Sequence, residues 1–251
     1  GSPPQGLLSR LRLALLKRQA QALDGAICTS HECMRQLLSL SGGRLPCSVE
    51  RPQIVARYGS SSKPRARRLL YLGRIEENKG VFLLLEAFEA LKDSHTHLSL
   101  DFAGTGSYQA ALETRIRARD DDRVRYLGSL TSEGVHAVLA DADLLVCPTM
   151  TTFNEGLALV GFEAAAHGVP SVLSSIVPAQ DLLGDGCAVF EADSLEGLTS
   201  TLAVLIGNDA AFANLCAGLK PVTDQIYDRS ASWGSRLCQA ILQETLPRSV
   251  R

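Results

Sequence analysis

The chain has 251 residues, 45% of them apolar, and a formal net charge of −2 at pH 7. This length fits one large domain, or one domain with part of another. The near-neutral charge argues against nucleic acid as a partner, because nucleic-acid-binding domains usually carry a basic excess. No apolar run approaches the roughly 20 residues that cross a bilayer, and no signal peptide is recognisable. Seven cysteines without metal-ligand spacing favour reduced thiols and a cytoplasmic location.

Residues 7–23 predict a basic amphipathic helix with three leucines on one face, namely Leu8, Leu11 and Leu15. One interpretation is attachment to an anionic membrane. The other, which we favour, is a helix packed on a sheet with its Arg and Lys side chains in solvent. A short strand over 25–30 and a helix over 31–40, closed by Gly42 and Gly43, follow. Together these elements are typical of the last βα unit of a domain.

Residues 44–66 are rich in proline and serine and predict a linker with one strand over 53–56. We therefore expect a domain remnant over 1–50, a linker over 51–66 and a second domain over 67–251. Gly1 and Ser2 are typical of a cloning remnant, so the natural chain is expected to begin further upstream.

From residue 67 onward, apolar runs typical of strands alternate with segments of helical periodicity. The predicted strands are 69–73, 98–103, 124–127, 144–147, 171–173 and 188–190. Such alternation predicts an α/β protein with a doubly wound, Rossmann-like parallel sheet of about six strands.

Ligands of such sheets bind at the carboxyl edge of the strands. Four polar or glycine-rich signals follow predicted strands: Gly73-Arg74, Gly104-x-Gly106, Gly128-Ser129 and residues 149–155. Each signal alone is weak, but their convergence on one edge indicates a binding site there.

Residues 154–168 predict a helix that ends at Gly168, with Glu155 and Glu163 eight positions apart. On a helix, eight positions cover roughly 12 Å, which is the scale of a nucleotide-sugar. Free amides at the helix start suit a diphosphate. Both glutamates are equally compatible with ordinary helix positions in solvent.

Residues 72–80, LGRIEENKG, resemble the Gly-Arg-x4-Lys-Gly loop of family-4 retaining glycosyltransferases of GT-B fold. Glu155-x7-Glu163 with the following Gly168-Val-Pro resembles the second signature of that family. The resemblance covers about residues 67–243. It implies that this chain holds the C-terminal, donor-binding half of a GT-B fold with the tail of the N-terminal domain.

The resemblance assigns roles residue by residue. Arg74 and Lys79, with Gly73 beside them, would hold the diphosphate. Glu155 would bind hydroxyls of the donor sugar, and Glu163 the ribose hydroxyls. The amides of Leu159 and Val160 would meet the distal phosphate, and the backbone near Leu130 the base. For Arg74 the alternative is a surface ion pair with Glu76 or Glu77, and for Lys79 a solvated position.

This chain departs from the family pattern at two positions, with Ala158 where glycine is usual and Leu157 where an aromatic residue is usual. Both changes leave the sugar preference open. Asp141-Ala-Asp143 matches the Asp-x-Asp pattern of metal-dependent glycosyltransferases of another fold, but an ordinary turn explains it. Asp120-Asp-Asp122 is expected to be a solvated turn. We therefore expect neither a metal nor another cofactor.

The implied function is donor binding in an enzyme that transfers a hexose from an NDP-sugar to an acceptor glycan, lipid or small molecule. Most of the acceptor half is absent from this chain, so we expect the chain alone to be inactive. The alternatives are a GT-B phosphorylase or epimerase, and a non-catalytic nucleotide-sugar-binding subunit of a split enzyme. Peripheral membrane association of the complete enzyme stays open.

Overall fold

The computed structural model describes residues 6–54, 57–58 and 63–242. These residues form two compact units, one from residues up to 53 together with those from 228 onward, and one from residues 54–227. The predicted strand over 53–56 lies partly outside the described residues, and Gln53 and Ile54 have no strand structure.

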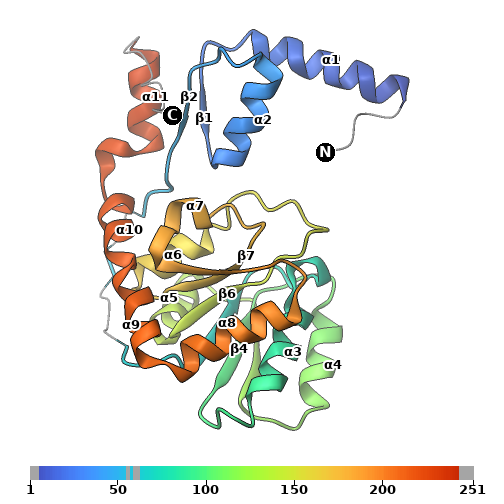
Figure 1. Ribbon diagram of the computed structural model, residues 1–251, viewed down its shortest axis with the longest axis vertical. Coiled ribbons are helices and arrows are strands. Elements are labelled where there is room, and N and C mark those ends of the chain that lie inside the picture. Colours follow the sequence, from blue (N-terminus) through green and yellow to red (C-terminus); the bar gives the residue numbers. More distant parts are fainter. Residues whose placement is uncertain (1–5, 55–56, 59–62, 243–251) are drawn as a thin grey trace. The chain divides into compact units, whose positions relative to one another are not determined.

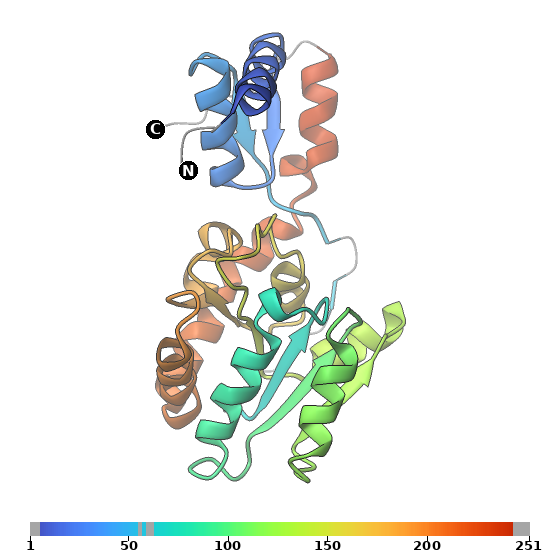
Figure 2. The ribbon, with the colours of Figure 1, turned by 90° about the vertical axis from the view of Figure 1, so that its right-hand side faces the viewer.

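The first unit contains a two-stranded parallel sheet of β1 (Ala26–Cys28) and β2 (Cys47–Val49). Helices α1 (Leu7–Gln21), α2 (His31–Ser41) and α11 (Trp233–Ile241) belong to the same unit. Helices α2 and α11 lie on either side of the two strands (Figure 2). β2 falls where the sequence predicts only linker, because a strand of three residues gives no periodic signal.

Helix α11 joins this unit through Glu50. The indole Nε1 of Trp233 donates to the Glu50 backbone oxygen at 3.2 Å, and Arg236 Nε donates to Glu50 Oε1 at 2.9 Å. Residues 228–242 belong to the same compact unit as the N-terminal segment, whereas the sequence analysis places them in the domain over 67–251.

The interpretation of α1 as a helix packed on a sheet does not hold within the described residues. Helix α1 contacts α2 and buries only Ala20. Its leucines stay exposed, including Leu8 at 74% and Leu11 at 58%.

The second unit is built on a six-stranded parallel sheet of order β5-β4-β3-β6-β7-β8, as the alternating pattern predicts (Figure 1). The strands are β3 (Arg68–Leu72), β4 (Ser99–Ala103), β5 (Val124–Gly128), β6 (Leu144–Cys147), β7 (Ser171–Ser174) and β8 (Cys187–Phe190). The order reverses between β3 and β6, and such switch points are where doubly wound sheets bind ligands.

Within the described residues this unit has eight α-helices, of which five alternate with the strands and three follow β8 in succession. They are α3 (Val81–Leu91), α4 (Gln109–Arg117), α5 (Ser132–Asp141), α6 (Val160–Ala166), α7 (Gln180–Leu183), α8 (Leu195–Gly207), α9 (Asp209–Ala217) and α10 (Leu219–Ile226).

Alternate strand residues divide the apolar core between the two faces of the sheet. Leu69 and Tyr71 of β3 share one buried cluster with side chains of α3, α4, α8 and α9. Leu70 points to the other face and is equally buried. Because helices cover both faces of the central strands, β3 and β6 are nearly continuous apolar runs, whereas the edge strands β5 and β8 are partly exposed.

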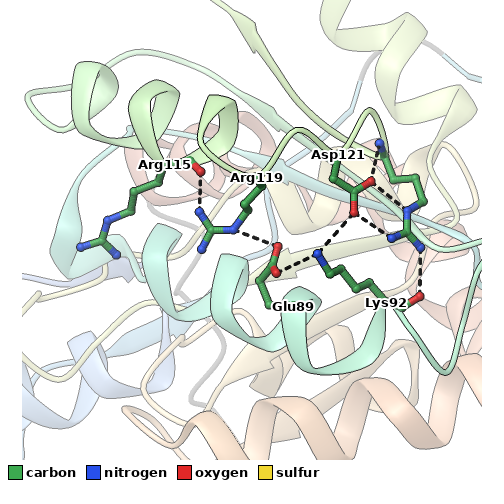
Figure 3. Close-up of polar contacts among 6 residues, drawn as sticks. Glu89, Lys92, Arg115, Arg119 and Asp121 are labelled. Atoms are coloured by element: carbon green, nitrogen blue, oxygen red, sulfur yellow. Dashed lines mark hydrogen bonds and ion pairs between the residues drawn. The ribbon is translucent and has the colours of Figure 1, made fainter.

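At the amino edge of the sheet, a network of charges ties α3 to α4 and β5 (Figure 3). Lys92 Nζ lies 3.0 Å from Glu89 and 3.5 Å from Asp121, and Arg119 Nε donates to Glu89 at 2.8 Å. Arg123 Nε and Nη2 donate to the two oxygens of Asp121 at 2.9 and 2.7 Å. Asp121 is 11% exposed, so the expectation of a merely solvated turn over residues 120–122 is wrong for this residue.

Candidate functional site

A cavity of about 510 Å³ lies at the carboxyl edge of the larger sheet. Loops after β3, β4 and β5 meet helices α5 and α6 around it. It is lined by Leu72, Gly73, Arg74, Gly104, Thr105, Ser129, Leu130, Ser132, Val135, His136, Val160 and Glu163. Five of the eight residues to which the resemblance assigns roles are among them: Gly73, Arg74, Leu130, Val160 and Glu163.

A larger hollow of about 640 Å³ lies at the amino edge, near the start of β3 and the α8–α9 junction. It contains none of the residues selected from the sequence. Its Arg65 is already paired with Asp209 at 2.9 Å. Size alone is therefore a poor guide here, and the chemistry favours the carboxyl edge.

Close backbone approach shapes this edge. A Cβ on Gly104 would lie 1.8 Å from the carbonyl oxygen of Gly73, so only glycine fits where the ends of β3 and β4 meet. Gly80, which follows Lys79, has φ 74° and would place a Cβ 2.0 Å from the Pro148 oxygen. Both glycines of the sequence signals therefore have a steric cause.

Lys79 and Glu155, which are not among the residues lining this cavity, form a mostly buried ion pair. Lys79 belongs to a 3₁₀ turn, Glu77–Lys79, and its Nζ donates to Glu155 Oε2. The two side chains are 15% and 11% exposed. Thr149 Oγ1 also donates to Glu155 Oε2, at 3.1 Å, and Ser174 Oγ holds the Thr149 backbone oxygen at 2.6 Å. The alternative of a solvated Lys79 does not hold.

The prediction that one helix carries both glutamates is wrong. Helix α6 begins at Val160, so Glu155 lies in the loop before it and Glu163 in its first turn. The break comes at Ala158, whose φ of 60° is left-handed and cannot continue a right-handed helix. The backbone there adopts a conformation suited to the glycine that is usual in the resembling family.

Arg74 is exposed, and its guanidinium has no hydrogen bond or ion pair among the described residues. The expected alternative, an ion pair with Glu76, is not observed. Ser107 instead donates to Glu76 through its backbone N–H at 3.0 Å and its hydroxyl at 2.5 Å, and these bonds lower the pKa of Glu76. The Arg74 Cζ lies over the ring of Phe153, 5.1 Å from its centroid.

Two backbone amides at the start of helix α6 are free within the described residues. The N–H groups of Gly161 and Phe162 bond to Ala158 and Leu159 oxygens. Those of Leu159 and Val160 have no acceptor among the residues that the structure covers. Leu159 is also 56% exposed.

Three rings stack behind the cavity. Tyr58 stacks on His167 at 4.1 Å between centroids, and its hydroxyl lies 3.1 Å from Nε2 of His136. His167 Nδ1 lies 2.8 Å from the Glu163 backbone oxygen. Burial lowers the pKa of His167, which favours a neutral ring whose Nδ1–H donates to Glu163. The stack thereby supports the first turn that carries Glu163.

The Asp-x-Asp pattern lies at the other edge of the sheet, before β6. Asp143 Oδ2 accepts from the backbone N–H groups of Arg67 and Arg68, both at 2.9 Å. Asp141 pairs with the Arg68 side chain. Within the described part of the chain, no group of three or more His, Cys, Asp or Glu side chains is arranged to hold a metal ion.

Sequence reasoning missed Phe153, Asp193 and the stacked His136 and His167. Phe153 carried a weak signal, as the lone aromatic residue of a polar loop after a buried strand. Asp193 carried no signal, because it accepts a hydrogen bond from the backbone N–H of Thr151 in that loop, 42 positions away in the chain.

Residues 66–208 match the model of the family described as glycosyl transferases group 1. The chain belongs to this family. It is 33% identical over 177 residues to a glycogen synthase of Mycobacterium tuberculosis, covering 68% of this chain and 42% of that protein. It is 28% identical over 149 residues to a phosphatidyl-myo-inositol mannosyltransferase of Mycobacterium leprae, covering 57% of this chain and 38% of that protein.

Solved structures share the architecture. Anabaena HepE in complex with UDP and glucose superposes with a TM-score of 0.74 at 17% identity, over 96% of this chain and 69% of that one. Sucrose-phosphate synthase from Thermosynechococcus elongatus gives 0.76 at 17% identity, over 94% and 63%. These similarities establish a Rossmann-like sheet of GT-B type. The chain spans about two fifths of the length of the curated relatives named above, 42% and 38%.

Among the described residues, no single helix has the length and apolar composition needed to span a membrane.

Proposed function

We propose that the larger unit binds the NDP-sugar donor of a retaining glycosyltransferase that transfers a hexose. One observation carries the proposal. Arg74 and Glu163 come from opposite sides of the switch point between β3 and β6, and both line one cavity of about 510 Å³ at the carboxyl edge of the sheet. Family membership supplies the reaction class.

In this proposal Glu163 accepts the ribose hydroxyls and the backbone near Leu130 meets the base. Arg74 and Lys79 hold the diphosphate, with the amides of Leu159 and Val160 near the distal phosphate. Glu155 takes sugar hydroxyls while it keeps Lys79 in place. Its second oxygen, Oε1, carries no bond from Lys79 or Thr149, both of which contact Oε2.

The chemistry follows from the charges. As the bond between the sugar and the diphosphate breaks, negative charge grows on the diphosphate. Preorganised cations stabilise this transition state more than they stabilise the ground state. Arg74 and Lys79 supply that positive charge without a metal. The acceptor, a glycan, lipid or small molecule, would attack from the face that the diphosphate leaves, so the anomeric configuration is retained.

Calorimetry with UDP, GDP, ADP and their nucleosides tests the donor site. We expect at least one diphosphate to bind, with no loss of affinity in EDTA. Glu163→Gln should weaken binding tenfold or more, because hydrogen bonds to charged groups contribute about 1.5–3 kcal/mol. The matched control is Glu86→Gln, at a side chain that is 52% exposed. We also expect removal of the ribose 2′-hydroxyl from the nucleotide to cost less affinity in Glu163→Gln than in the parent protein. Equal losses in these two proteins would show that Glu163 does not bind the ribose.

A second series tests the diphosphate position. The guanidinium can engage two phosphate oxygens, whereas an ammonium acts as a point charge. Arg74→Lys should therefore weaken diphosphate binding although the charge is kept, and Arg74→Ala should weaken it further, with little effect on the nucleoside. Arg117→Lys, at a side chain that is 78% exposed, is the control. Unchanged diphosphate affinity in both variants would place the diphosphate elsewhere.

We expect no sugar transfer by this chain alone, since it spans 42% of the glycogen synthase that it resembles. Product formation from the chain with a simple acceptor would contradict this expectation. A phosphorylase would instead bind inorganic phosphate and no nucleoside.

A further inference from the structure

One aromatic ring contacts both cations assigned to the diphosphate. The Nζ of Lys79 lies over the Phe153 ring at 4.1 Å from its centroid, and the Arg74 Cζ lies over it at 5.1 Å. The face of an aromatic ring carries negative electrostatic potential, and a cation within about 6 Å of the centroid is attracted to it. Phe153 therefore holds two positive groups that would otherwise repel each other.

The loop that carries Phe153 is fixed at several points. The Met150 backbone N–H donates to the Asn78 oxygen at 2.9 Å, which joins the loop to the turn that carries Lys79. The Thr151 N–H donates to Asp193 Oδ1 at 3.0 Å, and the Thr151 hydroxyl bonds to Asp193 Oδ2. Phe153 N–H closes the turn on the Met150 oxygen at 2.9 Å. The ring is thus held by groups from the ends of β3, β6 and β8.

An aromatic ring differs from a carboxylate in one respect that matters for anion binding. A carboxylate beside a cation fixes it but offsets part of its charge, as Glu155 does for Lys79. A ring fixes a cation through its quadrupole and brings no net charge. Arg74, whose guanidinium has no ion pair among the described residues, is consequently oriented while its full charge stays available to an incoming anion.

We propose that Phe153 is a positioning residue that holds Arg74 and Lys79 for the diphosphate and so makes the site prefer nucleoside diphosphates over nucleosides. This inference rests on the proposed function, because it assumes that the diphosphate meets these two cations. Asp193 acts indirectly, because its carboxylate binds Thr151 and so holds the loop that carries Phe153.

The test is the ratio of affinities for a nucleoside diphosphate (UDP, GDP or ADP, whichever the chain binds) and its nucleoside. Phe153→Leu keeps an apolar side chain and removes the π face. We expect its affinity for the nucleoside diphosphate to be three- to tenfold weaker than that of the parent, and its affinity for the nucleoside to be unchanged. Phe153→Tyr keeps the ring face and should stay within twofold of the parent for both ligands. A purely structural role would weaken both ligands equally.

A second variant guards against misfolding of Phe153→Leu. Asp193→Gly keeps the left-handed backbone of residue 193, whose φ is 64°, and removes the carboxylate that holds Thr151. It should shift the same ratio in the same direction, and its effect should not add to that of Phe153→Leu. If the parent binds a diphosphate and neither variant changes the ratio beyond twofold, the role of Phe153 is overturned alone. If the parent binds no diphosphate, the proposed function falls as well.

Discussion

The two edges of the larger sheet carry charged clusters of opposite design. At the amino edge, Lys92, Arg119 and Arg123 share the carboxylates of Glu89 and Asp121, so every charge has an opposite charge within 3.5 Å. At the carboxyl edge, Lys79 pairs with Glu155, Arg74 has no carboxylate partner among the described residues, and both cations contact the Phe153 ring. The first cluster is satisfied within the protein and joins helices. The second keeps one cation, Arg74, without a carboxylate partner among the described residues, and this side chain lines a cavity.

The difference shows how charges that stabilise a fold can be told from charges kept for a ligand. Both clusters are rich in Arg and Lys, so composition does not separate them. What separates them is that each cation of the first cluster meets a carboxylate, whereas Arg74 of the second lies over an aromatic ring that leaves its charge intact.

The largest effect on stability is expected from the backbone of the carboxyl edge. Gly104→Ala would place a Cβ 1.8 Å from the Gly73 oxygen at a φ of 127°. Overpacking and backbone strain each cost about 1–3 kcal/mol, so we expect a loss of about 3–5 kcal/mol in the free energy of unfolding by urea. Gly156→Ala, where a Cβ would meet nothing within 4 Å, is the control and should change little. Equal losses in the two variants would refute the steric argument.

The next effect distinguishes a charge kept for stability from one kept for a ligand. Lys79→Met leaves Glu155 at 11% exposure without its cation, and an uncompensated, mostly buried charge should cost about 2–3 kcal/mol. The double variant Lys79→Met/Glu155→Gln should recover most of that stability. Neither protein should regain parental affinity for a nucleoside diphosphate in calorimetry. Full recovery of binding in the double variant would show that Lys79 serves only Glu155.

A smaller effect is expected at the amino edge. The bonds from Arg123 and the charge of Lys92 hold the pKa of Asp121 well below its usual range. Asp121→Asn should cost about 1–2 kcal/mol of unfolding free energy and leave nucleotide binding unchanged. The exposed pair Lys220–Asp224 offers a control, since Lys220→Ala should cost less than about 0.5 kcal/mol.

The same carboxylate has a defined pH window. Its pKa is lower in the folded than in the unfolded state, where it is about 3.9, so its contribution is fully present above roughly pH 5 and is lost as pH falls below that. The stability curve of Asp121→Asn should therefore approach that of the parent as pH falls from 5 to 3. Parallel curves over this range would contradict the pKa shift.

The smallest effect concerns the loop before α6. Ala158 adopts φ 60°, which costs a residue with a side chain about 1–2 kcal/mol, partly offset by the greater chain entropy of glycine. Ala158→Gly should therefore raise the free energy of unfolding by about 0.5–1 kcal/mol. Destabilisation in this variant would mean that the Ala158 methyl group packs favourably enough to outweigh the strain.

The amino-acid sequence by itself determined the sheet and pointed to the edge at which the cavity lies. The central strands β3 and β6 are apolar runs. The backbone at the carboxyl edge depends on Gly80 and Gly104, where local sterics admit no side chain. Arg74 and Glu163 could be selected because signatures of fixed spacing place them at strand and helix ends.

Only the tertiary structure decided how these side chains are paired. Glu155 lies outside the helix because Ala158 adopts a left-handed backbone conformation. It pairs with Lys79, which is 76 positions away in the chain. Asp121 pairs with Lys92 at the end of α3, and Phe153 contacts both Arg74 and Lys79. Trp233 and Arg236 of α11 bond to Glu50. Each contact joins segments distant in the chain, and periodicity and spacing report only on neighbours along it.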